Sequence, residues 1–176
     1  MTQSGNDTIL KIDGSFGEGG GQILRNCCAL SHLLSKAISI EQIRKGRTVP
    51  GLRNQHLTGI QFLSTYFGHE LTGAQVKSTE LVLKPVAMTP KQWESLPSEM
   101  IGDTKSAGSC TLLAQMLLPV FLFPSRGGGG GGGGANQLKN SSSEVEEQKF
   151  VDMTFENTVL RFIGGTNVDF SPPIDT

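Results

Sequence analysis

The sequence contains few of the residues that would place it in several large protein classes. Its 176 residues include three cysteines, one tryptophan and one tyrosine. Cys27, Cys28 and Cys110 match neither a disulfide framework nor a zinc-ligand spacing, so we expect them to be reduced helix residues. No run approaches the 18 apolar residues of a membrane span, and residues 1–7, predicted to be disordered, contain no signal-peptide core. These absences predict an intracellular protein without a membrane segment.

The sequence also lacks a strong net charge and two familiar phosphate-binding loops. Its 15 Lys and Arg residues nearly balance 16 Asp and Glu residues, for a formal charge of −1. Such a balance argues against a general polyanion-binding coat, although it does not exclude a local basic patch. There is no Gly-x4-Gly-Lys-Ser/Thr segment, and Gln22 stands where a dinucleotide fingerprint starting at Gly17 needs glycine.

A glycine-rich stretch from Asp13 to Gly21 is the most informative part of the sequence, because five of its nine residues are glycine. Glycine lets a ligand approach the backbone closely, and a following helix directs unpaired N–H groups at a phosphate. Glu18 would repel a phosphate unless a divalent cation lay between them, so it is predicted to be a metal contact or a proton acceptor. Arg25 would supply a permanent cation. The alternative is a strand-to-helix turn that needs glycine for packing alone.

A basic segment follows in residues 36–53. Five cations and one anion occur there: Lys36, Arg44, Lys45, Arg47 and Arg53 against Glu41. Such a cluster could anchor a nucleic acid through its phosphates without reading its sequence, or it could be a solvated loop. Gln55 and His56 come directly after it. His56 could hydrogen-bond a phosphate or a sugar hydroxyl, or it could be a half-buried structural histidine. We assign no role to His32 or His69.

Apolar patterning predicts a first folding unit in residues 8–85. Alternating residues predict strands at 8–12, 37–43, 69–72 and 80–84, and helical spacing predicts helices at 22–35 and from Pro50 to a cap at Gly68. This β-α-β-α-β-β order gives one sheet with both helices on one side, which is an α/β (α+β two-layer) fold.

A second copy of the unit is predicted in residues 100–176, after a loop-like linker at 86–99 that carries Trp93 as a surface or edge-packing residue. Helical spacing predicts a helix at 107–118, capped by Ser106 and ended by Pro119, and a strand is predicted at 158–163. Residues 126–148 include eight consecutive glycines and are predicted to be a flexible insertion without chemistry. The second unit is expected to be incomplete.

Four motifs in order resemble the RNA 3′-terminal phosphate cyclase family. The first is Asp13-Gly-x-x-Gly-Glu-Gly-Gly-Gly-Gln-Ile-Leu-Arg25, and the second comprises Ile43-Arg-Lys-Gly-Arg47, Pro50-Gly-Leu-Arg53 and Gln55-His-Leu57. The third is Asp103-Thr-Lys-Ser-Ala-Gly-Ser109 with Gln115 after it, and the fourth is Gly164-Gly-Thr-Asn167 with Pro172 and Asp175. A non-catalytic ribosome-assembly branch of the family has lost the Glu-rich opening and the basic block. Both are present here, so the chain resembles the cyclase branch.

This resemblance implies a fold and a chemistry. The fold would repeat a βαβαββ unit similar to the C-terminal domain of initiation factor three. Such enzymes use ATP and a divalent metal (Mg or Mn) to adenylate a histidine, pass AMP to an RNA 3′-phosphate, and form a 2′,3′-cyclic phosphate. The implied site residues are Glu18 at the metal, Arg25 and His56 in catalysis, Arg44, Arg47, Arg53 and Gln55 at the RNA phosphates, and Gln115 and Pro172 at ATP.

The resemblance also shows departures. In the family the nucleophilic histidine lies farther along than residue 176, and none of the three histidines here matches it. We therefore expect a truncated form that is inactive in cyclisation on its own, because covalent catalysis requires the nucleophile. Its expected partner is RNA ending in a 3′-phosphate, and similarity to eukaryotic relatives favours the nucleus over the cytoplasm. The alternatives are a non-catalytic RNA-binding or ribosome-assembly protein on the same scaffold and a mononucleotide-binding enzyme with another substrate.

Overall fold

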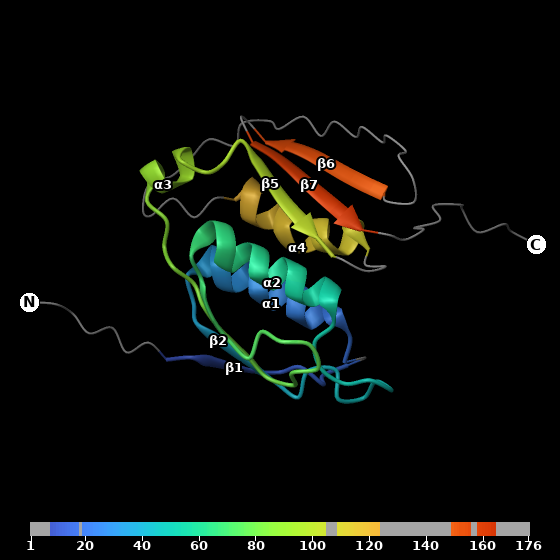
Figure 1. The fold of residues 1–176 in the computed structure, drawn as a ribbon. Coiled ribbons are helices and arrows are strands. Elements are labelled where there is room, and N and C mark those ends of the chain that lie inside the picture. The colour runs from blue at the N-terminus through green and yellow to red at the C-terminus, as the bar shows by residue number, and fades with distance from the viewer. Residues whose placement is uncertain (1–7, 18, 105–108, 124–148, 156–157, 165–176) are drawn as a thin grey trace, which may run out of the picture.

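The computed structural model describes residues 8–17, 19–104, 109–123, 149–155 and 158–164. Helices and strands alternate through much of this part of the chain (Figure 1). In chain order the elements are β1 (Leu10–Asp13), α1 (Gly21–Leu34), β2 (Ile38–Glu41), α2 (Asn54–Phe67), β3 (Glu70–Thr72), β4 (Leu81–Lys84), α3 (Pro90–Glu94), β5 (Glu99–Asp103), α4 (Cys110–Leu122), β6 (Lys149–Phe155) and β7 (Thr158–Gly164). The α/β fold class predicted from the sequence is confirmed.

The first sheet has the strand order β1-β2-β4-β3. Strands β1 and β2 are parallel, and α1 connects them; β4 pairs antiparallel with both β2 and β3. Ile38, Ile40, Leu81 and Leu83 alternate with less buried residues and lie in the core. The predicted β-α-β-α-β-β order of residues 8–85 is therefore observed.

The second sheet has the strand order β5-β7-β6. Strand β5 runs parallel to β7, where Met100 faces Leu160, and β6 pairs antiparallel with β7. Strand β6 was not predicted from the sequence. Each sheet thus contains a parallel pair and an antiparallel neighbour, although a repeat of the initiation-factor type and the proposed domain boundaries stay predictions.

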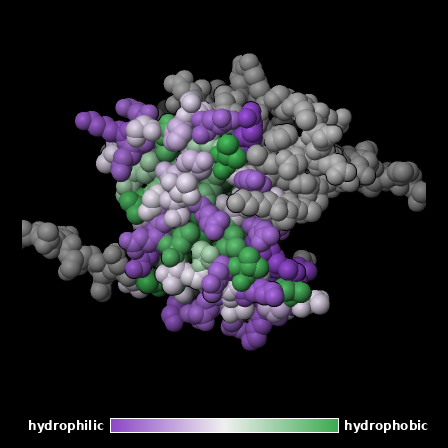
Figure 2. Space-filling view, in the orientation of Figure 1, coloured by the Kyte–Doolittle hydropathy of each residue, from purple (hydrophilic) through white to green (hydrophobic). Residues whose placement is uncertain are grey.

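Helices α1, α2 and α4 lie between the two sheets, with α1 and α2 toward the first sheet and α4 toward the second (Figure 1). Gly59 allows α2 to approach α4, because a methyl group at Gly59 would lie 2.6 Å from Sδ of Met116. Leu63, Leu117 and Val120 are fully buried in the resulting core. On the face seen in Figure 2, hydrophobic residues are interspersed with hydrophilic ones across the coloured part of the surface.

Three predicted element boundaries were wrong. Helix α2 begins at Asn54 rather than Pro50, because Gly51 and Leu52 make backbone hydrogen bonds to neighbouring loops, including Leu52 N–H to the carbonyl of Ser78 (2.9 Å). Helix α4 begins at Cys110 after a Ser109 cap, and Pro119 lies inside it. The helix continues to Leu122 because Val120 and Phe121 are buried, which offsets the lost backbone bond. Ser106, the predicted cap, lies outside the described residues.

The predicted linker contains helix α3. Thr89 and Gln92 cap the start of this helix through reciprocal hydrogen bonds. Trp93 on this helix packs at the edge of the core, which is the second of the two predicted alternatives. It is half-buried, and its ring packs 5.3 Å from that of Phe67 and 6.3 Å from that of Phe121, measured between centroids. The sequence could not decide between the two alternatives, because a single aromatic residue between prolines gives no periodic signal.

Candidate phosphate-binding site

The glycine-rich turn joins β1 to α1, and hydrogen bonds hold it in shape. The Asp13 carboxylate accepts bonds from the N–H (2.9 Å) and the hydroxyl (2.7 Å) of Ser15, and these bonds hold the pKa of Asp13 below its usual value. The N–H of Gly14 donates to the carbonyl of Glu41 (2.7 Å), which ties the turn to the end of β2. Gly17 and Gly19 adopt positive φ angles of 63° and 55°, which side chains rarely tolerate.

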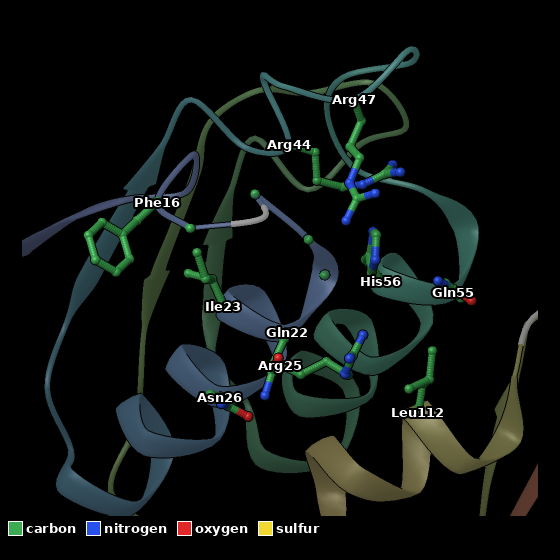
Figure 3. Close-up of a pocket in the computed structure, with 14 residues that line it drawn as sticks. Phe16, Gln22, Ile23, Arg25, Asn26, Arg44, Arg47, Gln55, His56 and Leu112 are labelled. Carbon is green, nitrogen blue, oxygen red and sulfur yellow. The ribbon is translucent and has the colours of Figure 1, made fainter.

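A pocket of about 560 Å³ opens beside this turn. The turn, the first part of α1, the basic loop at residues 44–53 and the first turns of α2 and α4 enclose it (Figure 3). Besides four glycines, its lining consists of the polar residues Gln22, Arg25, Asn26, Arg44, Arg47, Gln55 and His56 and the apolar residues Phe16, Ile23 and Leu112. No acidic side chain lines it among the described residues, so the pocket suits an anion.

Two glycines let cationic side chains approach the backbone. A methyl group at Gly21 would overlap Nε2 of His56 and would lie 2.9 Å from an Nη atom of Arg25. At Gly20 the nearest atom would be an Nη of Arg47, at 3.5 Å. The guanidinium groups and the imidazole therefore lie against the N-terminus of α1, where backbone N–H groups are also available to an anion.

His56 is buried, with 4% of its surface exposed, and its orientation is fixed by a backbone bond. The N–H of Arg53 donates to Nδ1 of His56 (3.1 Å), so in the neutral ring the proton is on Nε2, the atom that faces Gly21. Burial, followed by the nearby charges of Arg44, Arg25 and Arg53, lowers the pKa of His56 to about 4. Near neutral pH this ring is therefore an uncharged hydrogen-bond donor in a positively charged pocket.

The basic loop presents two arginines to the pocket. Arg44 is half-buried, its backbone has a positive φ of 55°, and its guanidinium donates to the carbonyl of Gly51 (3.2 Å). Burial, followed by the charges of Arg53 and Arg47, lowers the pKa of Arg44. Arg47 is exposed and points toward the same space (Figure 3). Arg53 is exposed at the start of α2 and does not line the pocket, although its charge acts on both Arg44 and His56.

Arg25 links the pocket to α4. Its Nε donates to Oε1 of Gln115 (3.1 Å), and burial lowers the pKa of the guanidinium. Gln115 is exposed, off the buried stripe of α4 as the sequence predicted, and is not among the pocket-lining residues. Of the other predicted site residues, Gln55 lines the pocket, whereas Glu18 and Pro172 lie outside the described residues.

Sequence reasoning missed part of the pocket. Gln22 and Asn26 lie four residues apart on α1 and therefore on the same helix face. Because Gln22 directly follows the glycine-rich turn, this spacing could have indicated Asn26 as a pocket residue. Ile23 and Phe16 had no recognisable polar signal. Leu112 comes from α4, and only the tertiary structure places it beside α2.

His32 and His69, to which no role was assigned, form a buried pair away from the pocket. Nδ1 of His32 lies 2.8 Å from Nε2 of His69, and the N–H of Val86 donates to Nδ1 of His69 (3.2 Å). Burial, followed by the nearby His69 ring, lowers the pKa of His32 to about 4. Burial also lowers the pKa of His69 to about 4. The three cysteines are free, as predicted.

Metal-ligand clusters and membrane-spanning helices are both absent from the described part of the chain. No group of three or more His, Cys, Asp or Glu side chains that could hold a metal occurs among these residues. The donors around the pocket are cationic or amide groups, so this described set fits phosphate oxygens but does not by itself fit a divalent cation. No helix in the same part of the chain is long and apolar enough to cross a membrane.

Comparison with known proteins gives the family. A model of RNA 3′-terminal phosphate cyclases matches residues 16–140, which include most of the glycine-rich turn, the basic loop and α4. The chain belongs to the RNA 3′-terminal phosphate cyclase family. The resemblance seen in the four motifs is thus confirmed at the level of the family.

Curated relatives carry the same description. A probable RNA 3′-terminal phosphate cyclase of Dictyostelium discoideum is 47% identical over 165 residues, which are 94% of this chain and 30% of that protein. The RNA 3′-terminal phosphate cyclases of Desulfurococcus amylolyticus and Drosophila melanogaster are 40% and 35% identical over 168 and 169 residues, each covering 96% of this chain and 37% of the relative. The chain therefore spans about a third of the length of these family members.

Proposed function

We propose that the pocket binds the terminal phosphate of an RNA 3′ end, as part of the ATP-dependent conversion of that phosphate to a 2′,3′-cyclic phosphate by adenylyl transfer. The observation that carries this proposal is the grouping of Arg25, Arg44, Arg47 and the Nε2–H of His56 around the glycine turn. Three permanent cations and a neutral donor would neutralise and orient a phosphate dianion. The family membership supplies RNA as the molecule that bears the phosphate.

Each side chain has a distinct part in this proposal. Arg44 and Arg47 approach from the basic loop and Arg25 from α1, so together they would contact different phosphate oxygens. His56 would donate one hydrogen bond and hold the phosphate close to Gly21. Gln55 would contact the adjoining sugar–phosphate backbone, and Arg53, outside the pocket, would add long-range attraction for the RNA.

The cosubstrate and metal assignments remain proposals from the sequence. Gln115 and Pro172 would contact ATP, and Glu18 would contact Mg or Mn. The bond from Arg25 to Gln115 supports placing Gln115 next to the phosphate pocket. Because the described donor set does not fit a divalent cation, no step is assigned to the metal here. We also propose nuclear rather than cytoplasmic residence, from similarity to eukaryotic relatives.

Covalent catalysis by the 176-residue chain alone is not part of the proposal. His32 and His69 are buried and bonded to each other, and neither lines the pocket. His56 faces three arginines and is assigned to phosphate binding. We therefore propose that this chain alone does not form a covalent AMP adduct. Incubation with radiolabelled ATP and Mg²⁺ or Mn²⁺, followed by denaturing electrophoresis, tests this, and an acid-labile label on the chain would contradict it.

Binding of matched RNA oligonucleotides tests the main proposal. Short RNAs of one sequence ending in 3′-phosphate or 3′-hydroxyl would be compared by fluorescence anisotropy. We expect the 3′-phosphate to bind at least tenfold more tightly, and Arg47→Ala to remove most of that preference. Equal affinity for the two ends would instead favour the alternative of a non-catalytic RNA-binding or ribosome-assembly protein on this scaffold.

A further inference from the structure

Phe16 is the most exposed large hydrophobic residue in the described part of the chain, with 79% of its surface accessible, yet it lines the pocket. An isolated exposed apolar side chain needs no explanation by itself. A phenylalanine at the edge of a cationic pocket is different, because a flat apolar face beside a phosphate site matches the two chemical parts of a nucleotide. Its position therefore suggests contact with a ligand.

The backbone at Phe16 is held in place although the ring is exposed. The N–H of Phe16 donates to the carbonyl of Asp13 (3.4 Å), and the carbonyl of Phe16 accepts from the N–H of Gly19 (3.1 Å). The Ser15 bonds to the Asp13 carboxylate hold the same turn. A ring presented from such a turn loses little further backbone freedom when a partner covers it.

Phe16 and the cationic side chains lie on different sides of the pocket. Figure 3 shows Phe16 on the opposite side of the glycine turn from Arg44, Arg47 and His56, with Ile23 between them. Arg25 and Leu112, which mark the side of the pocket nearest α4, also lie away from Phe16 in this view. A ligand held by its phosphate at the arginines could thus extend an apolar group toward Phe16 without approaching Gln115.

We propose that Phe16 stacks against the nucleobase of the 3′-terminal nucleotide of the RNA and so contributes to recognition of the RNA end. This inference rests on the proposed function, because it places the terminal phosphate at the arginines. Stacking on an aromatic ring tolerates any base, since every base has a π-face, so Phe16 favours a terminal base over its absence. The RNA is preferred to ATP as the source of this base because Gln115, the residue proposed at ATP, lies on the α4 side.

Affinity of the 176-residue chain for a fluorescein-labelled RNA 3′-phosphate tests the inference. Loss of one base-stacking contact on alanine substitution should raise Kd by about 5- to 150-fold. We therefore expect Phe16→Ala to weaken binding within this range and Phe16→Trp to preserve it. Phe123→Ala is the matched control, because Phe123 is also exposed, at 67%, but does not line the pocket. It should bind like the unaltered chain.

A double-mutant cycle identifies the stacked group. The same RNA with an abasic 3′-terminal residue should bind the unaltered chain more weakly, and Phe16→Ala should then have little additional effect. The introduced indole of Phe16→Trp, in a Trp93→Phe background, should be quenched by the RNA that has a terminal base and less by the abasic RNA. Far-ultraviolet circular dichroism checks that every variant is folded.

The outcomes separate this inference from the proposed function. If the unaltered chain prefers 3′-phosphate ends and Phe16→Ala binds equally well, the inference is overturned while the proposed function stands. If Phe16→Ala weakens ATP binding but not RNA binding, the base belongs to ATP and the inference is wrong. If the unaltered chain shows no preference for a 3′-phosphate, the proposed function fails and the inference fails with it.

Discussion

The guanidinium Nε of Arg25 donates a 3.1 Å hydrogen bond to Oε1 of Gln115, and this bond joins α1 to α4. The charged side chain of Arg25 lines the pocket, whereas Gln115 does not. In the proposed site Gln115 thus limits the orientations that Arg25 can adopt before any ligand binds.

Replacing Gln115 should therefore weaken phosphate binding even without ATP. A hydrogen bond to a charged group contributes on the order of 1.5–3 kcal/mol, so we expect Gln115→Ala to raise Kd for an RNA 3′-phosphate by about 10- to 150-fold. Gln61→Ala, at an exposed glutamine of α2 away from the pocket, is the control. Unchanged affinity in Gln115→Ala would mean that Arg25 needs no such anchor.

Gly21→Ala should disturb the site more than a typical glycine substitution. The added methyl group would overlap Nε2 of His56 and crowd Arg25, and relieving such overpacking costs roughly 1–3 kcal/mol. Gly46→Ala in the basic loop is a matched control, because its methyl group would meet no atom within 4 Å. Isothermal titration with RNA 3′-phosphate should show loss of binding only for Gly21→Ala. Normal binding by that variant would show that His56 can move away without consequence.

The salt dependence of RNA binding should report the arginines individually. Each phosphate contact that is removed lowers the magnitude of the slope of log K against log[salt] by about 0.7 for a single-stranded RNA. We expect this reduction for Arg47→Ala. Lys45→Ala should change the slope less, because Lys45 lies in the same loop but bonds to Gln42 (2.9 Å) and does not line the pocket. Equal slopes for the two variants would indicate diffuse attraction rather than a defined site.

The buried histidines predict acid sensitivity. The pKa values of His32, His69 and His56 are lowered to about 4, whereas an unfolded histidine titrates near 6.5. The unfolded chain therefore binds more protons between these values, so stability is complete above pH 6.5 and falls as the pH decreases toward 4. The loss should be at most roughly 3 kcal/mol for each histidine.

Urea unfolding at several pH values measures this effect. The decrease between pH 6.5 and 5 is the diagnostic part, because ordinary carboxylates titrate mainly below that range. His32→Phe with His69→Leu should flatten the decrease, since both titrating rings of the pair are removed. A free energy of unfolding that stays constant from pH 6.5 to 5 in the original chain would show that the histidines remain accessible to protons.

Much of the fold could be predicted because local patterns agreed with the tertiary structure. Alternation in β2 and β4 and helical spacing in α1 gave the first sheet and its helices. Predicted boundaries were wrong where tertiary contacts outweighed local signals. Helix α4 continues past Pro119, for example, because Val120 and Phe121 are buried. Strand β6 follows a long low-complexity segment, and its pairing with β7 depends on a partner that no local pattern specifies.

The candidate site was predictable where charge and glycine gave a signal. Arg25, Arg44, Arg47, Gln55 and His56 line one pocket, as expected of residues in two motifs close along the chain. The structure separates two positions within the glycine stretch, and ligand contact there stays a prediction. A methyl group at Gly14 would meet the carbonyl of Glu41 at 2.8 Å, which is a packing constraint, whereas Gly21 faces the pocket. Phe16 could not be predicted, because apolar side chains mark a ligand site only when their exposure is known.

The parallel pairing of β5 with β7 has a consequence for the order of assembly. In a chain made from its N-terminus, the first sheet can form once residue 84 is available, but Met100 obtains its neighbour Leu160 only after residues 149–164 have been added. Until then the side of α4 that contacts β6 and β7 is exposed to solvent, and pairing of such distant segments is intrinsically slow. We therefore expect nascent chains that end before residue 149 to be the form of this protein most dependent on chaperones.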